Sequence, residues 1–251
     1  MIKSKGLNKL YTFLKGFILL NILWYIFSIL MNSRILPNPI EIYKYLPNII
    51  KGDFYKHILA SLYRVFYGLF IAYFIGIIIG ILMGYYEKFN KILNPLIYFT
   101  YPIPKTALLP ILMTLYGLGD ISKISLIVLI TIFSVIVSVR DAVKNIAKDM
   151  YNPLISLGAN KFQLIRHIVI PSILPEILTN LRLAIGTSFS ILFFAEAYGT
   201  KEGIGYFIQD AWTRINYIEM YGGILVLSFL GLILFILLDL LEANICSWKN
   251  R

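Results

Sequence analysis

Six long apolar segments constrain the fold of this chain more than any other feature. They are residues 12–31, 62–86, 95–117, 122–139, 173–197 and 218–241. A helix needs roughly 20 apolar residues to cross the ~30 Å hydrocarbon core of a bilayer, and each segment is about that long. Hydrophobic residues make up 59% of the chain and charged residues only 14%, which excludes an ordinary soluble domain. The sequence predicts one all-α integral membrane domain, residues 1–251, with six transmembrane helices.

The distribution of lysine and arginine predicts how these helices are oriented. With the N-terminus inside, 13 of these residues lie on the cytoplasmic side and eight on the outer side. This excess favours cytoplasmic N- and C-termini. The formal net charge of +10 is spread over short loops rather than one soluble face, so no nucleic-acid partner is expected.

The sequence offers little for catalysis or for a cofactor. Cys246 is the only cysteine, which rules out an intrachain disulfide and a cysteine-based metal site. His57 and His167 lie in predicted loops, and His-Glu-x-x-His is absent, so an intramembrane enzyme is disfavoured. The nucleotide-binding pattern Gly-x-x-x-x-Gly-Lys-Ser/Thr is also absent. No catalytic, cofactor or metal site is predicted.

Small residues recur at every fourth position of the second segment. They are Gly68, Ala72, Gly76, Gly80 and Gly84. In lipid, the hydrophobic effect does not drive helices together. Rows of small residues let two helix backbones approach closely, and this close packing is a main source of association energy. This row predicts a helix-packing groove, with a substrate-lining role as the alternative.

A candidate pathway or gate comprises Pro102, Pro104, Arg182 and Glu196. The two prolines should break the third segment, and broken helices occur at membrane depth only where protein or a water-filled path satisfies the freed carbonyls. A kink without a transport role is the alternative. Arg182 lies inside the fifth segment, where it should form an ion pair or serve the pathway. For Glu196, near the outer end of that segment, a simple interfacial carboxylate is the favoured interpretation.

A polar stretch, residues 149–171, separates the fourth and fifth segments. Asn152 followed by Pro153 predicts a helix start, and Gly158 permits the turn that ends this helix. Lys161 through His167 should form a second short helix before Pro171. The stretch is therefore predicted to form two short helices joined by a turn, between two spans.

This stretch resembles the cytoplasmic signature of permease subunits of binding-protein-dependent ABC importers: Glu-Ala-Ala, three residues, Gly, nine residues, Ile-x-Leu-Pro. Gly158 is followed by nine residues and then Ile168-Val169-Ile170-Pro171. The first half departs from the signature, because Asn152-Pro153-Leu154 stand where Glu-Ala-Ala would be. The resemblance covers roughly residues 57–248 and is closest to the nitrate, sulfonate and taurine branch. Its other motifs are Tyr101 to Ala107 with Pro110, Gly117 to Ile124, Leu174-Pro175, Leu181 to Ala184, Ala195-Glu196 and Gly203-Ile204-Gly205.

The resemblance implies a fold like that of the methionine importer's permease, in the cell membrane. It also implies two cytoplasmic ATPases, an external solute-binding protein and, as the expected pair, a homodimer of permeases. A coupling helix would dock on the ATPase without the usual glutamate. The coupling residues it suggests are Asn152, Pro153, Leu157, Gly158, Ala159 and Pro171. A secondary, ion-coupled transporter of small solutes is the alternative function. The substrate stays open, because the binding protein selects it.

Overall fold

The computed structural model describes residues 2–246, with side chains from Lys15 onward, and this part of the chain is helical without any β-strand. The helices are α1 (Ile2–Met31), α2 (Pro39–Ile50), α3 (Phe54–Tyr85), α4 (Glu87–Thr100), η1 (Lys105–Leu108), α5 (Leu109–Tyr116), α6 (Asp120–Lys144), η2 (Lys148–Met150), α7 (Asn152–Ser156), α8 (Lys161–Leu164), η3 (Ile165–Val169), α9 (Ile170–Glu196), α10 (Ile204–Thr213) and α11 (Tyr217–Ile245).

Four helices are long and apolar enough to cross a membrane. They are Phe54–Tyr85, Asp120–Lys144, Lys161–Glu196 and Tyr217–Ile245. A fifth span is added if the bent pair Glu87–Thr100 and Lys105–Tyr116 counts as one, and Lys15–Met31 is a shorter apolar helix. The chain is therefore an all-helical membrane protein, and a sixth span requires α1 to cross as well.

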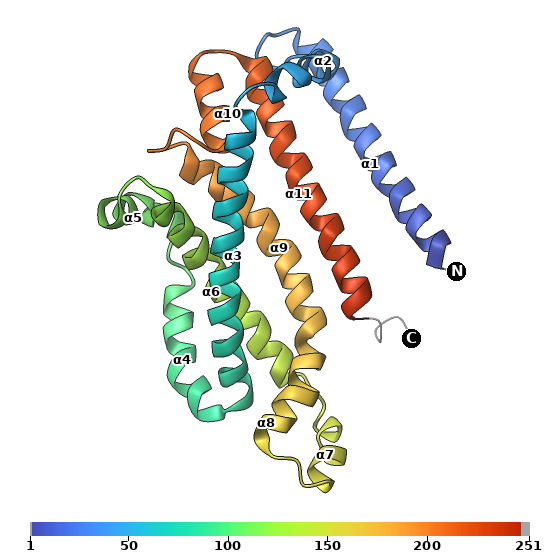
Figure 1. Ribbon diagram of the computed structural model, residues 1–251, viewed down its shortest axis with the longest axis vertical. Coiled ribbons are helices and arrows are strands. Elements are labelled where there is room, and N and C mark those ends of the chain that lie inside the picture. Colours follow the sequence, from blue (N-terminus) through green and yellow to red (C-terminus); the bar gives the residue numbers. More distant parts are fainter. Residues whose placement is uncertain (1, 247–251) are drawn as a thin grey trace.

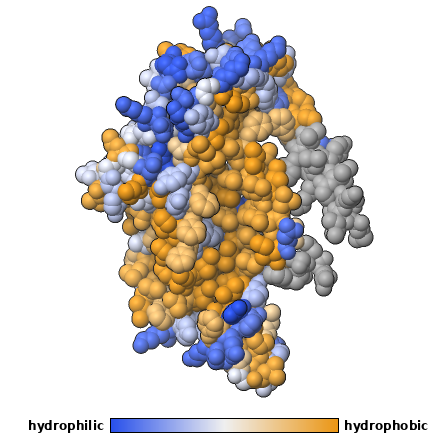
Figure 2. Space-filling model, viewed as in Figure 1, coloured by the Kyte–Doolittle hydropathy of each residue, from blue (hydrophilic) through white to orange (hydrophobic). Residues whose placement is uncertain are grey.

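The helices are arranged with different short elements at the two ends of a bundle (Figure 1). The long helices α3, α6, α9 and α11 form the bundle, in which α3 packs most extensively on α6 and α9 packs on both α6 and α11. The short helices α7 and α8 project at one end, whereas α2 and α10 lie at the opposite end. Figure 2 shows apolar side chains across the middle of one face and hydrophilic side chains at both ends, the pattern of a protein that sits in a bilayer.

The row of small residues on α3 faces α6. A Cβ atom added at each of four of its glycines would lie only 2.5–2.8 Å from a β-branched side chain of α6. The pairs are Gly68 with Ile127, Gly76 with Val135, Gly80 with Val139 and Gly84 with Val143. Ala72, the fifth member, is completely buried. A ridge of β-branched residues therefore fills the glycine groove, which places this row between two helices.

The third apolar segment differs from its predicted bounds of 95–117. Its first helix, α4, begins at Glu87 and contains Pro95, because residues 87–94 are helical yet too polar for an apolar window to include. The chain then breaks at residues 101–104, and the two helical parts meet at 82°. The break at Pro102 and Pro104 is as predicted, since proline removes a backbone donor and disfavours helix in the residue before it.

The predicted end of a second short helix before Pro171 is wrong. The helix that starts at Lys161 continues as one 36-residue helix to Glu196. It includes a π-helical turn, η3, in which the N–H of Ile170 donates to the carbonyl of Ile165. Pro171 lies just after this turn, where the change to π-helical bonding allows a residue without an N–H inside the continuous helix.

Candidate functional site

The α7–α8 projection, residues 152–164, is held in shape by a complete C-terminal capping motif. Gly158 has φ +79°, a left-handed conformation that glycine adopts without the usual steric penalty. Its N–H donates to the carbonyl of Ile155 at 2.9 Å, and the N–H of Ala159 donates to that of Leu154 at 3.0 Å. The turn predicted at Gly158 is thus a defined Schellman motif.

The helix start predicted at Asn152 is confirmed, but the Asn152 side chain does not cap this helix. Asn152 is the first residue of α7, its cap position is taken by Tyr151, and no side chain caps this helix. The Asn152 side chain instead donates to Asp149 at 3.5 Å. Because α7 has only five residues, it depends on the motif at its other end more than on a cap.

A capping box that the sequence reasoning missed begins α8. The N–H of Gln163 donates to Asn160 Oδ1 at 2.9 Å, and the N–H of Asn160 donates to Gln163 Oε1 at 2.8 Å. The spacing Asn-x-x-Gln is the signal that could have revealed it. Together with the Schellman motif, this box fixes both sides of the turn.

The α7–α8 projection exposes large apolar side chains on an otherwise polar segment. Leu157 is 85% exposed, Phe162 is 70% exposed and Ile155 is more than half exposed. Apolar side chains this exposed, beyond the end of the bundle, mark an interaction surface. Among the predicted coupling residues, Leu157, Gly158 and Ala159 lie together at the tip, whereas Pro171 lies inside α9.

A polar cleft of about 940 Å³ opens between α6 and α9 on the same half of the bundle as the projection. Its lining residues are Tyr101, Ser134, Val137, Ser138, Asp141, Ala142, Asn145, Ile146, Ala147, Met150, Ser172, Pro175, Glu176 and Asn180. Asn180 is held at both ends of its amide: it accepts from the Tyr73 hydroxyl at 2.6 Å and donates to Ser134 at 3.1 Å. A polar cleft between spanning helices is a suitable path for a hydrophilic solute.

The break at Pro102 and Pro104 adjoins this cleft without lining it. Tyr101, the residue before Pro102, belongs to the lining. Lys105 Nζ donates to the Tyr101 carbonyl at 2.9 Å and lies 5.1 Å from the centre of the Phe133 ring. The lysine therefore satisfies a carbonyl at the end of α4, as basic side chains commonly do at helix C-termini.

Arg182 lies outside the cleft and joins α9 to α11. Its guanidinium forms ion pairs with Asp239 and with Glu242, the latter at 3.0 Å. All three side chains are partly exposed, at 21–34%. The geometry fits an interhelical ion pair more directly than a pathway role.

Glu196 is completely buried, so the interpretation as a simple interfacial carboxylate is wrong. Its carboxylate accepts from Arg64 at 2.5 Å, from Ser61 at 2.9 Å and from the N–H of Gly205 at 2.9 Å. Arg64 also forms an ion pair with Asp120 at 2.7 Å. We call Ser61, Arg64, Asp120 and Glu196 the Arg64 cluster.

Two of the eight basic residues that the sequence assigns to the outer side are buried. Arg64 is 3% exposed and Lys123 is completely buried. Lys123 Nζ donates to the carbonyls of Leu118 and Gly199, the latter at 3.3 Å. Both residues lie within long helices, Phe54–Tyr85 and Asp120–Lys144, and this position was the signal that could have revealed their burial.

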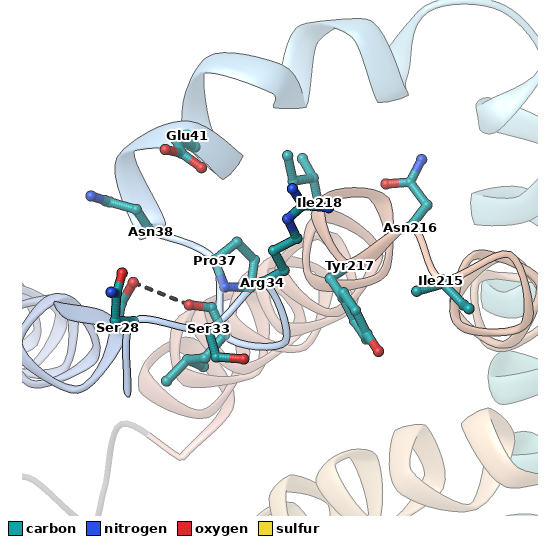
Figure 3. Close-up of a pocket in the computed structure, with 12 residues that line it drawn as sticks. Ser28, Ser33, Arg34, Pro37, Asn38, Glu41, Ile215, Asn216, Tyr217 and Ile218 are labelled. Atoms are coloured by element: carbon teal, nitrogen blue, oxygen red, sulfur yellow. Dashed lines mark hydrogen bonds between the residues drawn. The ribbon is translucent and has the colours of Figure 1, made fainter. Parts of the chain in front are cut away.

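A second cavity, of about 660 Å³, lies at the end that bears α2 and α10, opposite the projection (Figure 1), and Figure 3 shows the residues that line it. It is enclosed by the α1–α2 connection, including Arg34, and by the junction of α10 and α11, including Tyr217. Ile215 lines it in a left-handed conformation, with φ +59°, at the position of a Schellman motif where glycine is usual. No group of three His, Cys, Asp or Glu that could hold a metal ion occurs among the described residues.

A helical membrane domain with a polar cleft between its spans and a capped projection at one end defines a membrane transport subunit. Residues 72–247 match the binding-protein-dependent transport system inner membrane components, and the chain belongs to this family.

Curated relatives match over nearly the whole chain. The taurine transport system permease protein TauC of Escherichia coli (strain K12) is 31% identical, over 93% of this chain and 88% of the relative. The formylaminopyrimidine transport permease protein ThiX of Halalkalibacterium halodurans is 29% identical, over 94% of each. The putative aliphatic sulfonates transport permease protein SsuC of Bacillus subtilis is 27% identical, over 99% of this chain and 92% of the relative.

Solved structures show the same fold. The MetNI methionine ABC transporter in inward-facing conformations gives a TM-score of 0.63 at 19% identity, covering 75% of this chain and 94% of the matched chain. A bacterial ABC transporter for alginate import gives 0.67 at 14% identity, covering 97% and 99%. The fold is therefore that of ABC importer permeases.

Proposed function

We propose that this permease subunit of a binding-protein-dependent ABC importer is driven by ATPase subunits that dock on the α7–α8 projection. The observation that carries the proposal is the exposure of Leu157 and Phe162 on a turn that two capping motifs hold rigid. A rigid turn can transmit motion from a partner to α9, because α8 and α9 form one continuous helix. ATP hydrolysis then occurs on the partner chains.

This docking defines the orientation that we propose. If the projection meets a cytoplasmic ATPase, both termini are cytoplasmic, and the end formed by α2 and α10 faces the external binding protein. Six spans in the cell membrane, with α1 as the first, satisfy this orientation. The excess of basic residues on the cytoplasmic side supports it.

The polar cleft between α6 and α9 serves as this subunit's part of the translocation path. Alternating access would open it to one side at a time, with Pro102 and Pro104 as a hinge beside it. Arg182 would keep α11 attached to α9 during this motion, and Glu196 would hold the outer end of α9. A homodimer of permeases is the proposed assembly, as the resemblance to ABC importer permeases implies.

The proposal is tested by changing the apolar tip. Leu157→Asp and Phe162→Asp should each weaken co-purification of the ATPase about 10-fold or more, because charges in a docking surface remove its anchors. Ile35→Asp is the matched control, since Ile35 is also exposed but lies at the opposite end. Unchanged co-purification and unchanged ATP-driven uptake in both tip variants would contradict docking here.

A backbone variant tests whether the turn must be rigid. Gly158→Pro removes the N–H that donates to Ile155 and cannot adopt φ +79°. It should leave the protein in the membrane but abolish stimulation of ATP hydrolysis by the binding protein. Gly52→Pro, at φ +83° on the opposite end, is the control.

Uptake that collapses with an ionophore and needs no ATP would instead indicate a secondary transporter.

A further inference from the structure

The walls of the polar cleft are asymmetric in charge. Most of its polar groups are neutral: the hydroxyls of Ser134, Ser138 and Ser172 and the amides of Asn145 and Asn180. Among the residues that the structure describes, the only charged side chains that line it are Asp141 and Glu176, and no described lysine or arginine does so. The cleft therefore offers hydrogen bonds together with negative charge.

The two carboxylates are only partly neutralised. Asp141 pairs with Arg140 at 2.8 Å, and Arg140 lies outside the lining, where it also donates to Asn94. Glu176 is exposed on α9 and forms no ion pair with any residue in the described part of the chain. Lys105 Nζ donates to the Tyr101 carbonyl and lies over the Phe133 ring, beside the cleft and outside its lining. Within the lining, the charge that remains without an ion-pair partner among the described residues is the carboxylate of Glu176.

On the α9 wall, the backbone supplies no site for an anion. Free N–H groups at a helix N-terminus commonly bind anions. Residues 161–196 form one continuous helix past Ser172 and Glu176, so α9 presents no helix start to the cleft. A solute there meets fixed hydroxyl and amide groups, of which Asn180 is the most firmly placed.

We infer that the cleft passes a small polar solute that is uncharged or cationic and disfavours anions, with Asp141 and Glu176 as the residues that discriminate. This inference rests on the proposed function, because it assigns a selectivity to the proposed translocation path. Acidic side chains that line a narrow path repel anions and attract cations.

The experiment measures solute binding without the external binding protein, which would otherwise impose its own choice. The nucleotide-free complex of permease and ATPase, in lipid nanodiscs, is examined by saturation-transfer difference NMR with three probes of similar size: ethanolamine, glycolamide and isethionate. The first is a cation, the second is neutral and the third is a sulfonate anion. Signals from ethanolamine and glycolamide should exceed that of isethionate about fivefold, the effect of one partly solvated charge pair.

The variant Asp141→Asn/Glu176→Gln should lower the ethanolamine signal, raise the isethionate signal and leave glycolamide unchanged, which also shows that the cleft is intact. Glu87→Gln is the control, because Glu87 is an exposed carboxylate outside the lining. Three outcomes would overturn the inference. In the unaltered chain, these are an isethionate signal equal to or above the others, or equal or absent signals from all probes. The third is a double variant that behaves like the unaltered chain. Stimulation of ATP hydrolysis by the binding protein is measured on the same complex. If the binding protein does not stimulate hydrolysis, the proposed function is wrong. If it does, but the three probes do not give the expected order of signals, only the inference about charge is wrong.

Discussion

Arg64 contacts groups from three separate parts of the chain. Its guanidinium donates to Asp120 at the start of α6, to Glu196 at the end of α9, and to the carbonyl of Glu202 at 2.8 Å in the following loop. Arg64 and Glu196 are both almost completely removed from solvent. Breaking such a pair is costly, because the remaining charge stays buried without a partner.

Arg64→Met should therefore destabilise the folded protein by about 3–5 kcal/mol. Arg64→Met/Glu196→Gln should recover a large part of this loss, because the amide is neutral and still accepts from Ser61 and the Gly205 N–H. Asp120 is half exposed and can remain charged in water. Thermal unfolding in detergent of the two single variants and the double variant measures the coupling. Additive losses would show that the pair is not an energetic unit.

The Arg64 cluster also shows that the burial of a charged residue cannot be predicted from its residue type alone. Arg64, Lys123 and Glu196 have the residue types of loops and interfaces, and only their positions inside apolar segments distinguish them from exposed charges. Their burial depends on partners up to 138 positions away, as in the bond between Arg64 and the carbonyl of Glu202. Gly158 could be predicted, because a left-handed turn selects for glycine locally.

At the scale of elements, the contact between α3 and α6 is the principal packing interaction of the bundle. Glycines at every fourth residue of α3 meet β-branched side chains at every fourth residue of α6. Matched spacings of this kind give a long, close contact between two helices, and in lipid such contact provides much of the association energy.

Gly80→Ala tests this contact. The added Cβ would lie 2.7 Å from Val139 Cβ and 3.0 Å from the Ile136 carbonyl, so the helices must separate, at a cost of about 1–3 kcal/mol. Gly186→Ala is the matched control, because its nearest neighbour, Phe235, lies at 3.5 Å. The control should gain up to about 1 kcal/mol from helix propensity. Comparable melting temperatures for the two variants would exclude the close packing.

Elements were predictable where their signal is local and repeated. The seam on α3 and the break at Pro102 and Pro104 both follow from spacing and residue type. The start of α4 and the continuity of α8 with α9 do not, because a polar helix lacks an apolar run and a π-helical turn leaves no compositional mark. The polar cleft was also missed, since it forms only when α6 and α9 meet.

At the scale of the whole molecule, the two ends differ in a way that matches different partners. One end bears the α7–α8 projection with exposed apolar side chains, and the other bears α2, α10 and the cavity near Ile215. A transport subunit needs such a difference, because ATP is used on one side of the membrane and the solute arrives on the other.

Single cysteines at the two ends test this orientation in intact cells. Cys246, the only cysteine, is buried, and Cys246→Ser gives a cysteine-free background. In that background, Asn160→Cys in the projection should react with a membrane-impermeant maleimide only after the cells are permeabilised. Lys201→Cys, in the exposed loop between α9 and α10, should react in intact cells because it faces outward. The reverse pattern would contradict both the cytoplasmic termini and the docking of an ATPase on the projection. If both positions are labelled in intact cells, both lie on the outer side of the membrane, and the chain between them crosses the membrane an even number of times. This result would contradict the placement of the two ends on opposite sides.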